Sequence, residues 1–262
     1  MITAGIDVGT RFLKISIVDG TVLIGSAVVE MRGTFKKTSV GAFDRALAAA
    51  GIKKRNIKKI IATGYGGHLV KKAIYTLKDS ACIARGAWLQ DRRIKTVIDA
   101  GGLFIKVVTI DESGFLEQSY ENEKCAAGSG RFLEMIAESI DIPFSDISRF
   151  AADSMNPYVS TSTCAVFAES DIITQINMGR HGGDIIAGVI NSIAAKTVTL
   201  VQGASAEGPV AITGGLAKVR HFRDELIKRL DHEIIDCPID PQVLPSYGAA
   251  LLAQGIELNR RH

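Results

Sequence analysis

Short apolar runs and longer segments of helical periodicity alternate along the whole chain. Close to the N-terminus three apolar runs follow one another, separated only by Gly9-Thr10 and by Asp19-Gly20. Apolar runs of this length bounded by glycine or aspartate predict strands, and Asp-Gly is a strong hairpin signal. In the first third of the chain the pattern predicts strands at residues 3–8, 13–18, 22–29 and 58–62, and helices at 42–50, 67–76 and 79–90.

The rest of the chain repeats this order. The pattern predicts strands at residues 96–99, 105–110, 115–120 and 209–212, and helices at 130–139, 165–177, 184–201, 218–230 and 246–254. The glycine motifs repeat too, since Gly5-Ile-Asp-Val-Gly9 corresponds to Ile98-Asp-Ala-Gly-Gly102. Likewise, Ile60-Ile-Ala-Thr-Gly-Tyr-Gly66 corresponds to Val210-Ala-Ile-Thr-Gly-Gly-Leu216. A repeat of about 100 residues excludes the short-period repeat families.

A βββαβα unit used twice is the pattern of the actin-like ATPase fold. This is a ribonuclease H-like α/β architecture in which nucleotide binds in a cleft between two similar lobes. We expect an N-terminal lobe at residues 1–93 and a C-terminal lobe at 94–262. The final helix, near 246–262, is a candidate to pack back onto the first lobe.

Composition excludes several classes of function. The chain has 262 residues, of which 47% are hydrophobic, and a net charge of +3. So small a charge does not favour nucleic acid, and short basic groups such as Lys53-Lys54-Arg55 are typical of a solvated surface. No apolar run reaches the ~20 residues that span a bilayer, so we expect no membrane segment. With four irregularly spaced cysteines and no visible signal peptide, we expect a cytoplasmic protein with reduced thiols.

Candidate nucleotide chemistry lies where predicted strands end in glycine turns. Asp7 and Asp99 each precede such a turn, and their carboxylates are suited to a hydrated Mg²⁺ and to catalysis. Glycine allows the backbone to approach a phosphate closely, and a lysine can neutralise its charge. The expected ATP- or ADP-binding residues are Gly9, Thr10, Arg11, Phe12, Leu13, Lys14, Gly101, Gly102, Thr213, Gly214, Gly215 and Leu216. The chain lacks a Walker motif and a Gly-x-Gly-x-x-Gly after its first strand, which excludes P-loop and Rossmann sites.

Two cysteines precede predicted helices. Cys125 opens Cys125-Ala-Ala-Gly-Ser-Gly-Arg131, and Cys164 opens Cys164-Ala-Val-Phe-Ala-Glu-Ser170. A thiolate is stabilised near a helix N-terminus, where it can act as a nucleophile or a metal ligand. An iron–sulfur cluster usually needs four thiolates, and a symmetric dimer would supply the other two. Cys82 and Cys237 lack this context and are expected to be ordinary thiols.

These two cysteine motifs resemble those of the activators of 2-hydroxyacyl-CoA dehydratases and of the related ATP-binding subunits of benzoyl-CoA reductase. The resemblance extends over essentially the whole chain, through Gly5-Ile-Asp-Val-Gly9, Ala62-Thr-Gly-Tyr-Gly66, Val97-Ile-Asp-Ala-Gly-Gly102, Asp184-Ile-Ile-Ala-Gly188, Thr213-Gly-Gly-Leu-Ala217 and Gly248-Ala-Ala-Leu251.

The resemblance implies a homodimer, or a pair with a similar ATPase subunit, that holds one [4Fe–4S] cluster per dimer. By match to the family motif, Cys125 and Cys164 of each subunit would be the four ligands. ATP binding and hydrolysis would drive delivery of a low-potential electron to a CoA-thioester dehydratase or reductase component. Ferredoxin or flavodoxin would be the electron donor.

The chain departs from the family pattern in both phosphate loops. The first loop, Thr10-Arg11-Phe12-Leu13, is bulkier than usual, and the second has Leu103-Phe104 where dehydratase activators usually have Gln-Asp. The second departure predicts slow hydrolysis, or hydrolysis by a partner lobe, and favours a reductase-type subunit. Two alternatives stay open: a small-molecule kinase of the same fold with Asp99 as general base, and a non-hydrolysing, nucleotide-sensing subunit.

Overall fold

A computed structural model describes residues 1–32, 34–122, 129–159 and 165–256. The chain divides into two compact units, each with its own hydrophobic core. The first unit comprises Met1–Val97, Val108–Ser119 and Ile235–His262, and the second comprises Ile98–Val107 and Tyr120–Ile234. These units are defined by which residues pack together, whereas the lobes expected at 1–93 and 94–262 are continuous stretches of sequence. The boundary between the expected lobes therefore stays a prediction.

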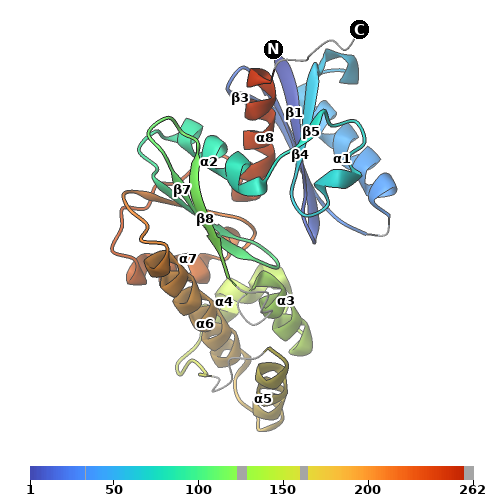
Figure 1. Ribbon diagram of the computed structural model, residues 1–262. Coiled ribbons are helices and arrows are strands. Elements are labelled where there is room, and N and C mark those ends of the chain that lie inside the picture. Colours follow the sequence, from blue (N-terminus) through green and yellow to red (C-terminus); the bar gives the residue numbers. More distant parts are fainter. Residues whose placement is uncertain (33, 123–128, 160–164, 257–262) are drawn as a thin grey trace. The chain divides into compact units, whose positions relative to one another are not determined.

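The first unit contains a five-stranded mixed sheet of order β3-β2-β1-β4-β5 (Figure 1). Its strands are β1 (Ile2–Val8), β2 (Phe12–Asp19), β3 (Val22–Glu30), β4 (Lys59–Thr63) and β5 (Tyr75–Thr76). The first three pair antiparallel through short turns, and β4 pairs parallel with β1. Because parallel strands need a crossover, helix α1 (Phe35–Ala50) connects β3 to β4.

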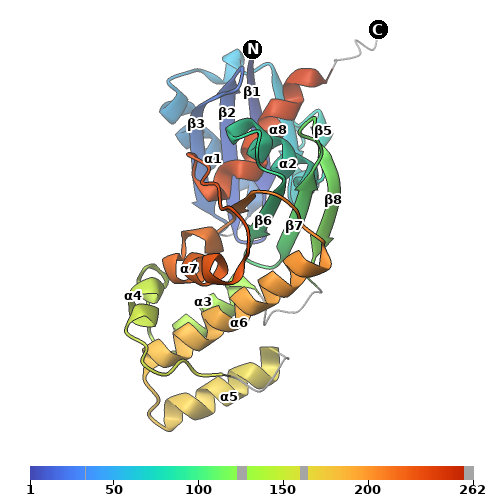
Figure 2. The same cartoon turned by 90° about the vertical axis from the view of Figure 1, so that its left-hand side faces the viewer.

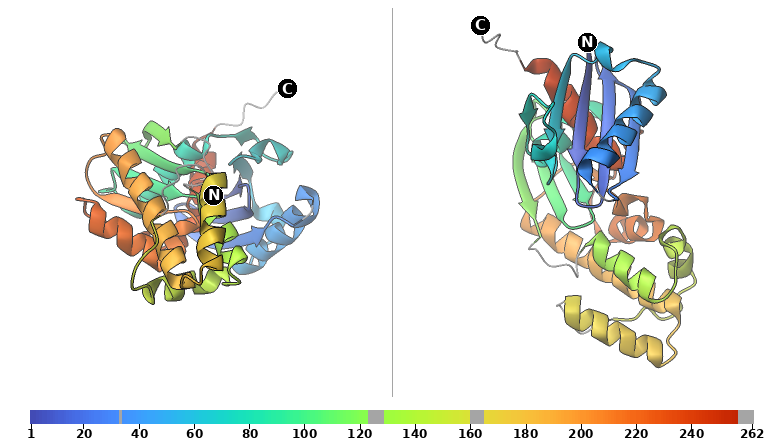
Figure 3. Two further views of the ribbon diagram at one scale, coloured as in Figure 1. Left: turned by 90° about the horizontal axis from the view of Figure 1, so that it is seen from below. Right: turned by 90° about the vertical axis from the view of Figure 1, so that its right-hand side faces the viewer.

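Helices cover both faces of this sheet. On one face α1 packs on the side chains of Ala4, Ile6 and Leu13. The opposite face carries α8 (Leu244–Gly255), where the Thr3 hydroxyl donates to the carbonyl of Ala250 at 2.6 Å. Helix α2 (Asp79–Gln90) packs against α8, and Figure 3 shows α1 and α8 on either side of the strands. The last helix of the chain thus completes the unit that the first strand begins.

Two glycines set the close crossing of α2 and α8. A Cβ added at Gly248 would lie 1.7 Å from the carbonyl oxygen of Cys82. One added at Gly86 would lie 2.9 Å from the carbonyl oxygen of Leu244. The helix backbones therefore touch directly, without side chains between them.

A second sheet, of order β8-β7-β6-β9, repeats the order β3-β2-β1-β4 (Figure 2). Its strands are β6 (Thr96–Ala100), β7 (Ile105–Ile110), β8 (Leu116–Glu121) and β9 (Val210–Thr213). The helices of the second unit are α3 (Gly130–Ser139), α4 (Ile147–Ala152), α5 (Ala165–Asn177), α6 (Gly182–Gly203) and α7 (Arg220–Arg229). The element order βββαβα occurs twice, which confirms the expected duplication.

Helix α6 is long and apolar enough to span a membrane by length and composition. Yet it forms the centre of the second core, where Ile185, Ile186 and Ile190 are fully buried beside Phe222 and Leu226 of α7. These contacts are those of a core helix. A cytoplasmic location stays a prediction.

The helix predicted at residues 67–76 is wrong. A single 3₁₀ turn, Gly67–Leu69, is followed by an extended segment in which the Ile74 N–H donates to the Ile60 carbonyl at 2.8 Å. Strand β5 then pairs with β4, with Tyr75 opposite Ile61. Hydrogen bonding to the sheet edge outweighs the weak helical periodicity of this segment, which Gly66-Gly67 weakens further. Helix α4 was not expected, and α1 begins seven residues earlier than predicted, at Phe35.

The α2–α8 crossing yields a prediction for stability. Replacing Gly248 by Ala places a methyl group against backbone atoms that cannot rotate away, so the free energy of unfolding should fall by about 2 kcal/mol or more. Urea denaturation measures this loss. Gly255→Ala, in the same helix with no atom within 4 Å of the added Cβ, is the matched control. Equal stability of the two variants would contradict a backbone-to-backbone crossing.

Candidate functional site

The same tight turn follows the first strand of each sheet. In the first unit the Gly9 N–H donates to the Phe12 carbonyl at 3.0 Å, between β1 and β2. In the second, the Gly101 N–H donates to the Phe104 carbonyl at 2.9 Å, between β6 and β7. Both glycine N–H groups are therefore used inside the turn. A phosphate would have to be bound by other groups of the loop, such as the N–H and hydroxyl of the exposed Thr10.

Asp7 is almost completely buried at the end of β1, with only 4% of its surface exposed. Lys14 lies opposite it on β2, and its Nζ donates to Asp7 Oδ2 at 2.9 Å. On the other side is Gly64, whose φ of +82° suits glycine, and where an added Cβ would lie 2.1 Å from Asp7 Oδ1. The carboxylate is thus held between an ammonium group and the backbone after β4.

The second unit contains the counterpart of this arrangement. Asp99 is half-buried near the end of β6, and Lys106 follows it by seven residues, as Lys14 follows Asp7. Lys106 Nζ lies 3.8 Å from Glu121 Oε2 and 6.0 Å from the centre of the Phe104 ring. Sequence reasoning missed Lys106, although the repeated spacing of seven residues was a sufficient signal.

The turn after β9 corresponds to the turn after β4. Gly214 has a φ of +87°, and a Cβ added there would lie 2.4 Å from the carbonyl oxygen of Ala100. Thr213 and Leu216 are both buried, and Gly215 is half-buried. Leu216, like Leu13 of the first loop, belongs to a hydrophobic core, so both could contact a nucleotide only through their backbones.

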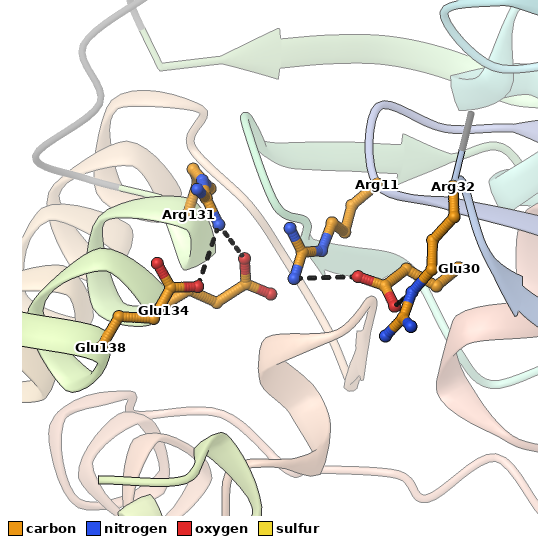
Figure 4. A network of polar contacts seen from close by, with 6 residues as sticks. All are labelled: Arg11, Glu30, Arg32, Arg131, Glu134 and Glu138. Carbon is orange, nitrogen blue, oxygen red and sulfur yellow. Dashed lines mark hydrogen bonds and ion pairs between the residues drawn. The ribbon is translucent and has the colours of Figure 1, made fainter. Parts of the chain in front are cut away.

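Arg11 in the first loop has a defined partner. Its Nη2 lies 3.1 Å from Glu30 Oε1, at the end of β3. Glu30 Oε2 also accepts a hydrogen bond from Arg32 Nε at 2.6 Å (Figure 4). The bulky departure at this loop therefore forms part of a charge network, which the sequence pattern did not predict.

The second loop is bonded to the start of α3. The Gly130 N–H donates to the Gly101 carbonyl at 3.2 Å, and the Arg131 N–H donates to the Gly102 carbonyl at 2.8 Å. Ser129 caps the helix, because its hydroxyl oxygen accepts from the Phe132 N–H at 3.4 Å. The first N–H groups of α3 are therefore bound to the loop and the cap.

Cys125 and Cys164 lie outside the described residues, and their role as ligands stays a prediction. Helix α5 begins directly after Cys164, and α3 begins five residues after Cys125, both as predicted. The other two cysteines do not form thiolates readily, since burial raises the pKa of Cys82 to about 12 and that of Cys237 to about 11. Within residues 1–32, 34–122, 129–159 and 165–256, no three His, Cys, Asp or Glu side chains are grouped to hold a metal.

The segment that precedes Cys164 is tied to two helices. Asp184 Oδ1 on α6 accepts hydrogen bonds from the Ser154 hydroxyl at 2.7 Å, the Met155 N–H at 3.0 Å and the Asn156 N–H at 2.9 Å. The Tyr158 hydroxyl donates to Asp171 on α5 at 2.5 Å, and burial together with this carboxylate raises the pKa of Tyr158 to about 12. Tyr158 is thus joined to α5, and residues 154–156 are joined to α6.

The two sheets have the same strand order, and in each a buried or half-buried aspartate leads into a glycine turn. Together these features define an actin-like ATPase fold. Comparison with known proteins specifies the family. The chain belongs to the BadF/BadG/BcrA/BcrD ATPase family, which it matches over residues 4–253.

Relatives align along almost the full chain. The activator of lactoyl-CoA dehydratase from Anaerotignum propionicum is 34% identical over 254 residues, which are 97% of each chain. One of the subunits of benzoyl-CoA reductase from Thauera aromatica is 33% identical over 242 residues, 89% of this chain and 83% of that one.

Solved structures of two relatives superimpose closely. Component A of the (R)-2-hydroxyglutaryl-CoA dehydratase from Acidaminococcus fermentans has a TM-score of 0.90 at 33% identity, covering 97% of this chain and 98% of that one. The activator of the 2-hydroxyisocaproyl-CoA dehydratase from Clostridium difficile, with bound ADPNP, has a TM-score of 0.89 at 30% identity, covering 98% and 99%.

The buried Asp7–Lys14 pair yields a testable double mutant. Lys14→Met leaves the Asp7 carboxylate buried without its ammonium partner, so the free energy of unfolding should fall by about 2 kcal/mol or more. Adding Asp7→Asn removes the unpaired charge and should restore much of this loss. Urea denaturation measures both changes, with the exposed Lys37→Met as control. An additive double mutant would contradict the pairing.

Asp184 yields a prediction for pH dependence. The N–H of Asn156, followed by the Ser154 hydroxyl, holds the pKa of Asp184 below its usual value. The stabilisation is then present above the unfolded pKa of about 3.9 and is lost as the pH falls through the lower folded pKa. Asp184→Asn should therefore be less stable than wild type at pH 7, and the difference should shrink below about pH 3.9.

The stability difference can be followed by chemical denaturation across the pH range. Asp153→Asn, at an exposed position that ends α4, is the matched control. A stability difference between wild type and Asp184→Asn that stays constant down to the lowest pH would rule out the charge of Asp184 as its source.

Proposed function

We propose that this protein is an ATP-driven electron-transfer activator. In this proposal a homodimer, or a pair with a similar ATPase subunit, holds one [4Fe–4S] cluster through Cys125 and Cys164 of each subunit. It delivers a low-potential electron to a component that acts on a CoA thioester, either a 2-hydroxyacyl-CoA dehydratase or a benzoyl-CoA reductase-type enzyme. The observation that carries the proposal is where helices α3 and α5 begin, at Gly130 and Ala165, shortly after Cys125 and Cys164 in the sequence. Each precedes a helix of the second unit, and the first of these helices is bonded to a candidate phosphate loop.

Asp7 and Asp99 are the proposed ligands, through water, of the Mg²⁺ that accompanies ATP. Lys14 donates a hydrogen bond to the Asp7 carboxylate and lies close enough to the first loop to balance phosphate charge. The glycine turns bring the backbone near the phosphates, and Thr213, Gly214 and Gly215 form the proposed contact with the rest of the nucleotide.

The chemistry of the cysteines fits a cluster shared between subunits. Fe–S clusters are held by thiolates, usually four of them, and supply a carrier for single electrons. Burial raises the pKa of Cys82 and Cys237, so neither is a ready ligand, and Cys125 and Cys164 are the two proposed ligands of each chain. A twofold axis supplies the other pair. Ferredoxin or flavodoxin is the proposed electron donor.

The residues of the second loop determine how fast we expect the protein to hydrolyse ATP. Leu103 and Phe104 occupy the positions at which dehydratase activators usually carry Gln and Asp, and neither side chain can orient a water molecule or a metal ion. We expect ATP hydrolysis by the isolated protein to be slow, and to accelerate when the partner component is added. The same departure is the reason to retain a benzoyl-CoA reductase-type partner as the second candidate.

Iron analysis tests the proposal directly. After anaerobic reconstitution the protein should be brown and dimeric, with about four irons per dimer and an EPR signal after one-electron reduction. Cys125→Ala and Cys164→Ala should each lose the iron, because either substitution removes two of the four ligands of the dimer.

Cys82→Ala is the control, since its buried thiol is not a ligand in this proposal and the iron should remain. Colourless wild-type protein after reconstitution would overturn the cluster assignment. Iron that survives both the Cys125 and the Cys164 substitutions would do the same. Binding of ADPNP, measured by calorimetry on the same samples, separates a failed cluster from a misfolded protein.

A further inference from the structure

A strongly basic surface of the first unit has no role in the proposed function. Residues 51–78 contain eight of the chain's 31 lysines and arginines and none of its 28 aspartates and glutamates. Six of the exposed cations lie in three short segments and are called the basic patch below: Lys53, Lys54, Arg55, Lys58, Lys71 and Lys72. Within the part of the chain that the structure describes, no carboxylate forms an ion pair with any of the six.

Strand register brings the segments of the basic patch together. Strand β5 pairs with β4 so that Tyr75 is opposite Ile61. Lys58 and Lys72 each precede this pair by three residues, at the same end of the two strands. Lys54 joins the third segment to them, because its side chain is in hydrogen-bond contact with that of Lys72. The basic patch is therefore one continuous surface.

The contact between Lys54 and Lys72 requires a neutral amine. A lysine ammonium group has three donors and no acceptor, so two charged lysines cannot form a hydrogen bond with each other. The hydrogen bond to Lys72, followed by desolvation and the charge of Lys72, lowers the pKa of Lys54. From α1, Asp44 acts in the opposite direction but more weakly, and the ring centre of Phe43 lies 5.0 Å from Lys54 Nζ.

A neutral lysine nitrogen is a nucleophile, and lysines with a lowered pKa are the ones that proteins use in this way. An ordinary lysine, with a pKa of about 10.4, is neutral in only about one molecule in a thousand at pH 7.5. Lys54 exceeds that fraction because its pKa is lowered. Its side chain is exposed, so the hydrogen bond to Lys72 opens to solvent readily and frees the lone pair.

The other cations of the basic patch attract ligands that carry several negative charges. Like charges gathered on one surface raise the local concentration of an oppositely charged ligand. CoA thioesters are such ligands, since they combine several phosphate groups with a carbonyl that amines attack. The choice of this ligand class rests on the proposed function, in which the partner component acts on a CoA thioester. The reactivity of Lys54 does not rest on it.

We propose that Lys54 is an acylation site whose acyl donor is a CoA thioester held by the basic patch. The Lys54 nitrogen attacks the thioester carbonyl, and a C–N bond forms as the C–S bond breaks. CoA leaves as a thiol with the proton that the nitrogen releases, so no electron is exchanged and no further reactant is needed. The product is a neutral amide, which removes one cation from the basic patch and ends the repulsion between Lys54 and Lys72.

Acetylation by acetyl-CoA tests the proposal. The purified protein is incubated with acetyl-CoA at pH 7.5, without iron or a partner, and mass spectrometry measures the rate at each lysine. Lys54 should be acetylated about fivefold faster than Lys37, an exposed lysine of α1, or more. Lys72→Met should lower the Lys54 rate about threefold or more, because the contact that favours the neutral amine is lost. Lys36→Met, the same change at an exposed lysine of α1, is the matched control and should leave the rate unchanged.

A second acyl donor separates recruitment from reactivity. S-acetyl-N-acetylcysteamine has the same thioester and no phosphate, so the preference for Lys54 over Lys37 should be about threefold smaller with it. Arg55→Gln combined with Lys58→Gln should slow the reaction of Lys54 with acetyl-CoA and leave the reaction with the phosphate-free thioester unchanged.

Equal acetylation of Lys54 and Lys37 by acetyl-CoA overturns the proposal, as does a Lys54 rate that Lys72→Met does not lower. An equal preference with both thioesters refutes recruitment by the basic patch. Iron analysis of the same preparation keeps the proposed function separate. Colourless protein that is acetylated at Lys54 would refute the cluster alone, and brown protein with an unreactive Lys54 would refute the acylation site alone.

Discussion

The backbone hydrogen bond that closes the first turn of each sheet is the constraint on which the rest of the structure depends. The bonds Gly9 N–H to Phe12 and Gly101 N–H to Phe104 reverse the chain after the strands that carry Asp7 and Asp99. Each reversal places a lysine seven residues after the aspartate on the neighbouring strand. In the first unit this yields the Asp7–Lys14 pair, and in the second it frees the loop carbonyls to bind α3. One local geometry, used twice, thus organises a charge pair and a link between loop and helix.

Much of this could be predicted from the sequence, because the signals were local or repeated. The starts of α3 and α5 follow from glycine and cysteine motifs that interrupt a clear helical period, and both were predicted correctly. The segment 67–76 could not be predicted in the same way. Ile74 and Tyr75 become extended because they pair with the edge of β4. That edge forms only when the chain folds, so a local pattern does not reveal it.

In the candidate site, too, local motifs could be predicted from the sequence, whereas contacts that depend on the fold could not. The identity of the loop glycines was evident from the duplicated motifs, but the partner of each N–H group was not. The N–H groups of Gly9 and Gly101 already donate within their turns, and the sequence does not reveal these partners. Arg11 was an anomaly in the sequence and is explained by Glu30, whose position at the end of β3 depends on strand register. Charge pairs between strands need register, and periodicity alone does not supply it.

The packing of α8 against β1 has a consequence for biosynthesis. Strand β1 leaves the ribosome well before α8, the helix that covers one of its faces, because the whole second unit lies between them in the chain. Until α8 has been synthesised, Thr3, Gly5 and Ser16 face no helix, and this face of the sheet is left uncovered. Contacts between distant parts of a chain form late and leave such surfaces open to aggregation. The first unit therefore completes its packing only after the second unit has been synthesised, and one face of its sheet stays accessible until then.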